Sequence, residues 1–334
     1  MVQKRFAVID FIRLYLILAL ILCHAFAPFN SAWPSISQCE ICTYKWVARV
    51  SYASLLETFV LISGFLFWRK LSRGIPLIEL IKDKFKRLYI PSLIIGVLYV
   101  VVLGLPMNST TVVRVLNGIG NLWFLPMLYG VFIIYWCASK YISNRLVLTL
   151  ILSIIAIFPY PTLPFQINNS LYYLFFFHVG CMLASKPKLS ERLTSPRILT
   201  LLLISYVMVF IISFYIRDHY LNIYDGLTFV QKSTLICAKH ICRFSYSIIG
   251  VFVIYSFFSI ISKYIKNDLS SIAGLCFGIY LLHEMILRVL YYRIHIVESI
   301  DIVYAPWLAA LITLLVSIAT VRCLKYFKFS RYIL

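Results

Sequence analysis

Three ionisable side chains interrupt the first apolar segment of the chain, which runs from Phe6 to Phe29: Asp10, Arg13 and His24. Eleven residue steps along an α-helix return a side chain to within roughly 20° of its starting direction and about 16 Å further along the axis. Arg13 and His24 therefore share one face of a predicted helix, and Asp10 shares it too. Ionisable groups at membrane depth are costly and usually face a protein interior or a wet cavity, so this face is predicted to line a site.

These residues also permit a purely structural role, in which Asp10 and Arg13 form an ion pair at the helix start and His24 makes a polar contact between helices. The catalytic interpretation needs a group that accepts a proton near neutral pH, and histidine is the natural choice. We take His24 as the candidate catalytic residue, with Arg13 and Asp10 beside it. The few His and Cys residues do not show the spacing of metal ligands, so no metal is expected.

A carboxylate and a small-residue notch mark the second apolar segment. Glu57 lies well inside it, and Ser63-Gly64-Phe65 follows. Small residues let another backbone or a thin ligand approach closely. The segment therefore predicts either a helix-packing notch or part of a ligand path, with Glu57 as a further candidate catalytic residue.

Two polar patterns lie near predicted helix ends. Arg87 belongs to a basic stretch that suits either the phosphates of a nucleotide-like ligand or anionic lipid headgroups. Trp123 is either an interfacial anchor or a surface for stacking a sugar.

In a late apolar segment, Tyr280 and His283 precede Glu284. His283 is expected at a depth similar to that of His24, which predicts a shared polar cavity.

The composition identifies an all-α polytopic membrane protein, since 62% of the 334 residues are hydrophobic and only 13% are charged. A membrane-spanning helix needs about 20 apolar residues. The predicted spans are 7–29, 46–68, 88–105, 121–138, 146–161, 170–185, 197–216, 242–262, 269–292 and 303–324.

Most of the 31 basic residues fall in every second segment between the predicted spans, counted from the N-terminus, and the 69–87 loop contains the most. The positive-inside rule then places both termini in the cytoplasm. It also accounts for the net charge of +19 without nucleic-acid binding. Residues 1–334 are expected to form one membrane domain with no appended soluble domain. The longest outer segment, about 217–241, is long enough to form a lid, and Cys39 and Cys42 could form a disulfide if their loop faces an oxidising compartment.

Together these segments resemble the acyltransferase-3 family of bacterial integral membrane acyltransferases. The resemblance covers nearly the whole chain, and its most specific parts are Arg13-x10-His24, Glu57 to Phe65, Arg87-x3-Pro91, Trp123-Phe124-Leu125 and Tyr280-Leu281-Leu282-His283. Glu57 stands where the family commonly has Asp, Ile62 where it often has Phe, and Asn121 where it often has His.

The resemblance implies a ten-helix protein of the bacterial inner membrane. Such a protein moves an acyl group, usually acetyl, from cytoplasmic acetyl-coenzyme A to a hydroxyl of an envelope saccharide such as O-antigen or capsule. His24 would be the general base or an acylated nucleophile. Ser63, Gly64, Phe65 and Arg87 would contact the donor, and Trp123, Tyr280 and His283 would line the acceptor cavity.

Acetyl-coenzyme A is expected as a substrate and not as a resident cofactor, and the other expected partners are the saccharide and membrane lipids. Two other classes of protein fit the apolar helices with buried charges. One is a transporter or flippase of lipid-linked saccharide, in which those charges carry protons. The other is a non-catalytic accessory subunit, whose activity would survive the loss of His24.

Overall fold

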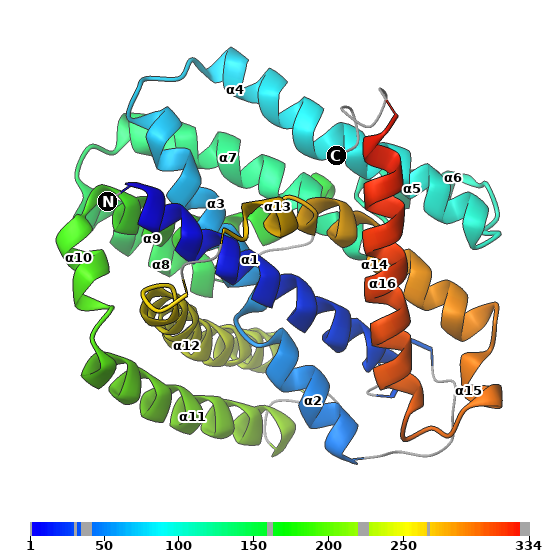
Figure 1. Cartoon of the computed structure of the whole chain (residues 1–334). Coiled ribbons are helices and arrows are strands. Elements are labelled where there is room, and N and C mark those ends of the chain that lie inside the picture. Colours follow the sequence, from blue (N-terminus) through cyan, green and yellow to red (C-terminus); the bar gives the residue numbers. More distant parts are fainter. Residues whose placement is uncertain are drawn as a thin grey trace. The chain divides into compact units, whose positions relative to one another are not determined.

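A computed structural model describes residues 2–29, 32–34, 42–158, 163–219, 227–265 and 268–327. These residues form helices and no strands (Figure 1). Seven of the described helical segments are long and apolar enough to cross a membrane. The prediction of an all-α polytopic membrane protein is therefore confirmed.

Short 3₁₀ segments bear the label η, as does one π-helical turn, η2. In chain order the helices are α1 (Val2–Ala25), η1 (Ala27–Phe29), α2 (Cys42–Tyr52), α3 (Leu55–Leu71), α4 (Leu77–Lys84), η2 (Phe85–Tyr89), α5 (Ile90–Val102), α6 (Ser109–Leu116), η3 (Gly120–Trp123), α7 (Phe124–Tyr141), α8 (Arg145–Ile157), η4 (Pro164–Gln166), α9 (Ile167–Ser185), α10 (Pro187–Arg192), α11 (Pro196–His219), α12 (Phe229–Ile261), α13 (Ser270–Ala273), α14 (Cys276–Tyr292), α15 (Ile296–Ser299) and α16 (Ala305–Lys325).

The chain divides into two compact units. The first contains residues 1–12, 56–80 and 130–267, and therefore most of α3 and all of α8 to α12. The second contains residues 13–55, 81–129 and 268–334, and therefore most of α1 together with α2, α5, α6, η3 and α13 to α16.

Within the first unit, α3 and α9 approach so closely that each needs a glycine where the other helix passes. A Cβ atom on Gly64 would overlap the main-chain carbonyl of Phe177, and one on Gly180 would overlap the carbonyl of Leu61. The thiol of Cys181 also donates to the Gly64 carbonyl at 3.2 Å. This is the small-residue packing that lets membrane helices gain close van der Waals contact.

The first unit also carries an apolar stripe that suits contact with lipid. Along α11, residues three or four apart are each more than half exposed, which places them on one face of the helix. They are Leu201, Ile204, Met208, Ile211 and Tyr215. A contiguous exposed apolar face of this kind is typical of a membrane-facing surface.

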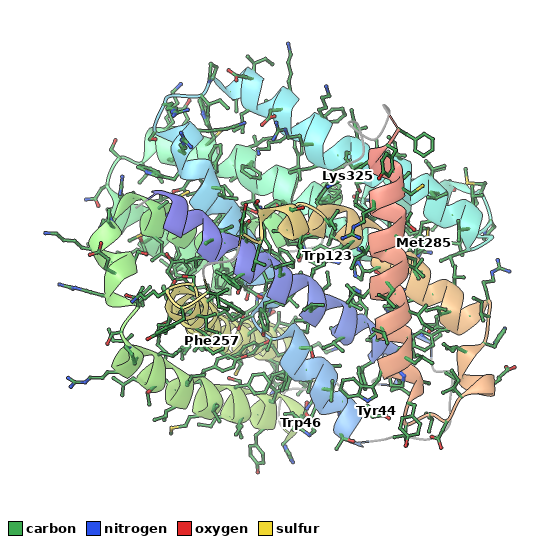
Figure 2. The ribbon with its side chains drawn as sticks, in the orientation of Figure 1. Tyr44, Trp46, Trp123, Phe257, Met285 and Lys325 are labelled. Atoms are coloured by element: carbon green, nitrogen blue, oxygen red, sulfur yellow. The ribbon has the colours of Figure 1, made fainter. Side chains whose placement is uncertain are left out.

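The second unit is held together around α14, which packs against α16, α5 and η3. Tyr44 lies on α2 (Figure 2), and its hydroxyl donates to the carbonyls of Ile302 and Val303, at 3.3 and 3.0 Å. The ring of Tyr44 also meets the edges of Phe26 and Phe29. These contacts fix α2 and η1 beside the chain that leads into α16.

Each of the ten predicted spans contains a helix, but several boundaries were wrong. The expected single helix over 46–68 breaks into α2 and α3 at Ser54, which has a left-handed φ of 59°. The first helix ends at Ala25, four residues before the predicted limit, so His24 lies in its last turn. The segment 269–292 divides into α13 and α14.

The outer segment predicted over 217–241 is much shorter than expected, because α11 continues to His219 and α12 begins at Phe229. Thr228 starts α12 with a reciprocal capping box, in which its hydroxyl accepts from the Gln231 amide and the Gln231 side chain accepts from the Thr228 amide. This Thr-x-x-Gln pattern precedes an apolar run and signals the helix start in the sequence. Cys39, one half of the predicted Cys39–Cys42 disulfide, lies outside the described residues.

Candidate active site

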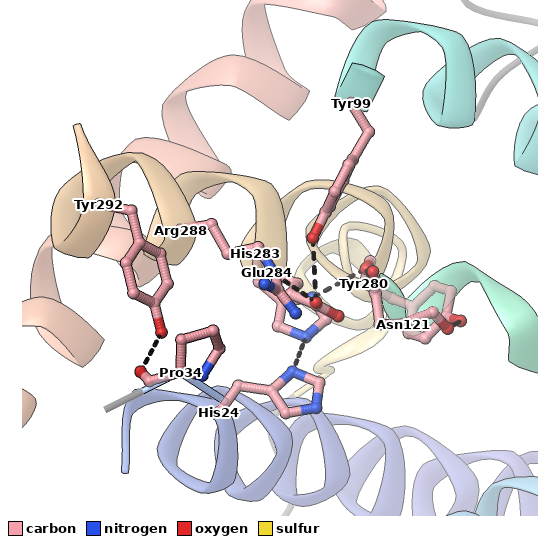
Figure 3. Close-up of polar contacts among 9 residues, drawn as sticks. All are labelled: His24, Pro34, Tyr99, Asn121, Tyr280, His283, Glu284, Arg288 and Tyr292. Atoms are coloured by element: carbon pink, nitrogen blue, oxygen red, sulfur yellow. Dashed lines mark hydrogen bonds and ion pairs between the residues drawn. The ribbon is translucent and has the colours of Figure 1, made fainter. Parts of the chain in front are cut away.

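His24 and His283 face one another across α1 and α14 in the second unit (Figure 3). The Nδ1 atom of His24 is 3.0 Å from the Nε2 atom of His283, and the rings are nearly parallel, with centroids 5.1 Å apart. His283 is fully buried, whereas His24 retains partial exposure. The sequence prediction that these two histidines share a polar site is supported by this contact.

The hydrogen bonds of His283 assign the protons of both rings. Its Nδ1 atom lies 2.8 Å from the Tyr280 carbonyl and 3.2 Å from the Ile279 carbonyl. Because a carbonyl only accepts, this nitrogen carries a proton, and in a neutral ring the Nε2 atom is then an acceptor. His24 therefore donates from Nδ1, which leaves its Nε2 atom with an unprotonated lone pair on a partly exposed ring.

Asn121 supports this arrangement from η3. Its side-chain amide donates to the Tyr280 carbonyl at 2.7 Å, which is the same oxygen that binds His283. The Tyr280 hydroxyl returns a hydrogen bond of 2.5 Å to the Asn121 carbonyl. Buried polar groups are costly unless bonded, and this reciprocal pair satisfies both residues while it connects η3 to α14.

Glu284 lies next to His283 in sequence and is buried with two donors. The Arg288 Nε atom donates to its Oε1 atom at 2.7 Å, and the Tyr99 hydroxyl donates to the same oxygen at 3.1 Å. Gly120 lies against this carboxylate, because a Cβ there would come within 3.0 Å of Oε1. The positive φ of 60° at Gly120 is a second reason why a glycine fits this position.

Trp33 contacts both the ion pair and the catalytic candidate. The guanidinium of Arg288 lies 4.3 Å from the centroid of the Trp33 ring, and the same ring is 5.6 Å from the ring of His24. A cation over an indole face is a favourable contact. Arg288 and His24 thus both contact the Trp33 ring, which places this basic residue near His24.

Arg13 and Asp10 occupy earlier turns of α1, and both are half-buried. Eleven residues of helix place Arg13 about 16 Å along the axis from His24, as the sequence predicts. Trp123 lies in η3, two residues after Asn121 (Figure 2). Its ring meets the edge of the Phe124 ring, with centroids 6.2 Å apart.

Glu57 belongs to the first unit, whereas His24 belongs to the second. The Glu57 Oε1 atom accepts from Arg243 Nη2 at 3.1 Å and from the Tyr172 hydroxyl at 3.1 Å. Arg243 also donates to the Tyr173 hydroxyl at 2.8 Å and covers the Tyr172 ring. This carboxylate therefore belongs to an ion pair between α3 and α12.

The predicted donor-binding residues make different kinds of contact. The Ser63 hydroxyl donates to the Phe59 carbonyl within α3 at 2.9 Å, Gly64 packs against α9, and Phe65 is buried. Arg87 lies in η2 with a largely exposed side chain and pairs with Asp83 at 2.9 Å. Across the described part of the chain, no three His, Cys, Asp or Glu side chains group closely enough to bind a metal ion.

Arg288, Trp33 and Tyr99 were missed as site residues. Glu284 and Arg288 are four apart in an apolar segment, and this spacing is typical of a helical ion pair, so the sequence did contain a signal for Arg288. Tyr99 and Trp33 lie far from α14 in sequence and carry no such pattern. Their roles depend on which segments pack together.

One family comparison covers almost the whole chain. The family model described as an acyltransferase domain, that of the acyltransferase-3 family, matches residues 6–322, a range that includes His24, Glu57, Asn121, His283 and Arg288. No curated protein and no solved structure matches the chain. The match extends over both compact units and so includes the paired histidines together with the α3–α12 ion pair. The protein belongs to the acyltransferase-3 family and is a membrane acyltransferase.

Proposed function

We propose that the protein is an O-acetyltransferase that moves an acetyl group from acetyl-coenzyme A to a hydroxyl of an envelope polysaccharide or its lipid-linked precursor. The observation that carries this proposal is the hydrogen-bond chain from the Tyr280 carbonyl through His283 to His24. It leaves an unprotonated nitrogen, Nε2, on the partly exposed ring of His24. Family membership supplies the reaction class.

In this proposal His24 acts as the general base. Its Nε2 atom accepts the proton of the acceptor hydroxyl as that oxygen attacks the thioester carbonyl carbon. The tetrahedral intermediate then collapses, the carbon–sulfur bond breaks, and the imidazolium returns the proton to the leaving thiolate. The products are an acetyl ester and free coenzyme A. General base catalysis of this type contributes about 10²–10⁴-fold.

The same lone pair would serve a covalent route. The Nε2 atom of His24 would attack the thioester directly, release coenzyme A, and hold the acetyl group until the acceptor hydroxyl displaces it. His283 supports either route, because its acceptor nitrogen favours the one tautomer of His24 that leaves Nε2 unprotonated. Ping-pong kinetics would indicate the covalent route, and sequential kinetics the general base route.

We further propose a location in the bacterial inner membrane, with donor entering from the cytoplasm and saccharide from the outer side. The support is the concentration of basic residues in the 69–87 loop. Arg87, Ser63, Gly64 and Phe65 remain proposed donor contacts. Trp123, Tyr280 and His283 remain proposed contacts of the acceptor cavity, and Asp10, Arg13 and Glu57 remain proposed participants in catalysis.

The test uses membranes that contain the full chain, labelled acetyl-coenzyme A and the surface polysaccharide of the host. The His24→Ala variant should insert normally and transfer label at a rate lower by about 10²–10⁴-fold. His219→Ala is the matched control, because His219 is an exposed histidine at the end of α11 and should leave transfer unchanged.

Full activity of His24→Ala would remove this histidine from the reaction and favour an accessory role for the chain. Saccharide movement across the membrane without any acetylation would favour the transporter class. Label on the polysaccharide that requires His24 would support the proposal, and chemical analysis of the labelled glycan would then identify the sugar and the hydroxyl.

A further inference from the structure

The first unit contains a cavity that the chemistry at His24 does not use. It has a volume of about 400 Å³ and lies where the ends of α3 and α7 meet the start of α8 and the end of α9. Its lining combines two cations, several hydroxyls and an apolar inner wall. Lys140 and Arg145 are the cations, and the described lining residues include no carboxylate.

Both cations are held in place by tryptophan side chains. The Lys140 ammonium lies 5.0 Å from the ring centroid of Trp136, and the Arg145 guanidinium lies 4.8 Å from that of Trp68. The Trp136 indole donates to the Ile75 carbonyl at 2.9 Å. Arg145 in turn donates to the Ser185 hydroxyl at 2.7 Å. These contacts restrict two long side chains that would otherwise sample many rotamers.

The inner wall offers a different environment. His178 is buried, and its two ring nitrogens are occupied by the hydroxyls of Tyr135 and Thr149, each at 3.0 Å. Leu148 and Met182 lie beside it. Because His178 has no ring nitrogen left for a ligand, this end of the cavity suits an uncharged or planar group and not a second anion.

The surroundings increase the positive charge of the cavity. Lys186 follows Ser185 and precedes the helix α10, and Lys186, Lys188 and Arg192 line a neighbouring hollow. A cleft lined by charges of one sign raises the local concentration of ions of the opposite sign. The natural ligand is therefore an anion that also carries an apolar or planar part.

We propose that this cavity binds a phosphate-bearing ligand, with the phosphate between Lys140 and Arg145 and the uncharged part against the inner wall. Two sources supply that chemistry, namely a nucleotide and the headgroup of an anionic phospholipid. The positive-inside rule assigns this face to the cytoplasm, where both occur. Binding of either ligand does not depend on acetyl transfer at His24.

The experiment measures binding to the purified full-length protein in nanodiscs. The nucleotide probe is adenosine 3′,5′-bisphosphate, titrated against the tryptophan fluorescence of the protein in zwitterionic lipid. The lipid probe is phosphatidylglycerol, whose retention by the protein is measured by native mass spectrometry. The test variant is Lys140→Gln/Arg145→Gln, and the control is Arg69→Gln/Arg73→Gln, which removes the same charge from exposed residues outside the cavity lining.

We expect the test variant to weaken binding of one probe by about tenfold or more, since each charge-assisted hydrogen bond to phosphate makes a substantial contribution, while the control changes it by less than about twofold. Loss of adenosine 3′,5′-bisphosphate binding identifies a nucleotide site, and loss of phosphatidylglycerol retention identifies a lipid site. The Lys140→Arg and Arg145→Lys variants keep the charge and should retain binding, which separates charge loss from misfolding. Equal binding of both probes to the test and control variants would overturn the proposal.

Discussion

The Nδ1 atom of His24 lies 3.0 Å from the Nε2 atom of His283, although the two residues are 259 positions apart in the chain. His283 is itself fixed by two main-chain carbonyls of its own helix. The orientation and tautomer of His24 are therefore set by α14 and not by α1, on which His24 resides. His283 is a positioning residue in this arrangement.

The His283→Leu variant should lose activity while it still binds substrate. Without an acceptor for its Nδ1 proton, His24 no longer favours the tautomer that leaves Nε2 unprotonated. Removal of the tautomer-fixing partner of a catalytic histidine can cost up to about 10⁴-fold in kcat, and we expect a loss of at least about tenfold. Steady-state kinetics should show the loss in kcat with KM for acetyl-coenzyme A nearly unchanged.

The His283→Gln variant is the control for this prediction, because a glutamine amide oxygen can accept from His24. It should retain more activity than His283→Leu at a similar expression level. A change in KM without a fall in kcat, or equal activity of the leucine and glutamine variants, would show that His283 contributes packing alone and does not position His24.

The Glu284–Arg288 pair should be more important for stability than for chemistry. In Glu284→Gln the guanidinium of Arg288 loses its charged partner at a site that is 23% exposed, against 3% for Glu284. Breaking a buried pair from one side typically costs about 3–5 kcal/mol, and partial exposure of Arg288 should bring the loss toward the lower end. Thermal unfolding in nanodiscs measures it.

The double variant Glu284→Gln/Arg288→Gln provides the comparison, because it removes both charges together. It should be more stable than Glu284→Gln alone, since replacing both partners avoids an uncompensated charge. If the stability loss of the double variant equals the sum of the losses in Glu284→Gln and Arg288→Gln, the two side chains do not interact.

The contribution of Asn121 should depend on the N–H donor of its side chain. A variant without such a donor should lose activity, and a variant with another N–H donor should retain more of it. In Asn121→Leu the Tyr280 carbonyl loses one of its hydrogen bonds in a buried site, which costs about 1–3 kcal/mol. It also loosens the carbonyl that fixes His283, so kcat should fall. The Asn121→His variant retains an N–H donor and should keep more activity. The measurement is transfer rate at matched protein levels, and equal activity of both variants would contradict the role.

The membrane map predicts opposite sides for two loops. A reporter fused at residue 76 should indicate the cytoplasm, because this position lies in the most basic part of the chain. A reporter at residue 225 should indicate the outer side. Paired alkaline phosphatase and fluorescent protein fusions measure both positions, and signals from the same side would refute the predicted order of spans.

The apolar segments could be predicted from the sequence because hydropathy is local. Each predicted span contains a helix, and the all-α class is confirmed. The breaks were harder to predict, since the left-handed turn at Ser54 lies within an apolar stretch that resembles one continuous helix. The early start of α12 could have been found from Thr228 and Gln231, which form a recognisable cap.

The site was predicted only in part, for a related reason. His24 and His283 were identifiable because ionisable groups are rare in apolar segments. Trp33, Tyr99 and the role of Asn121 depend on contacts between segments far apart in sequence, which periodicity does not encode. Glu57 was identified as an unusual carboxylate, but its partner Arg243 is 186 residues away.

The last turn of α1 has two attachments to α14, and they act at neighbouring residues. His24 bonds to His283, and the Tyr291 hydroxyl donates to the carbonyl of Ala25 at 2.6 Å. A shift or rotation of α14 by a single residue would break both hydrogen bonds at once. His24 would then lose its orientation, and the last turn of α1 would lose its contact with α14. Compounds or substitutions that displace α14 should thus abolish acyl transfer without contacting His24, the proposed catalytic residue.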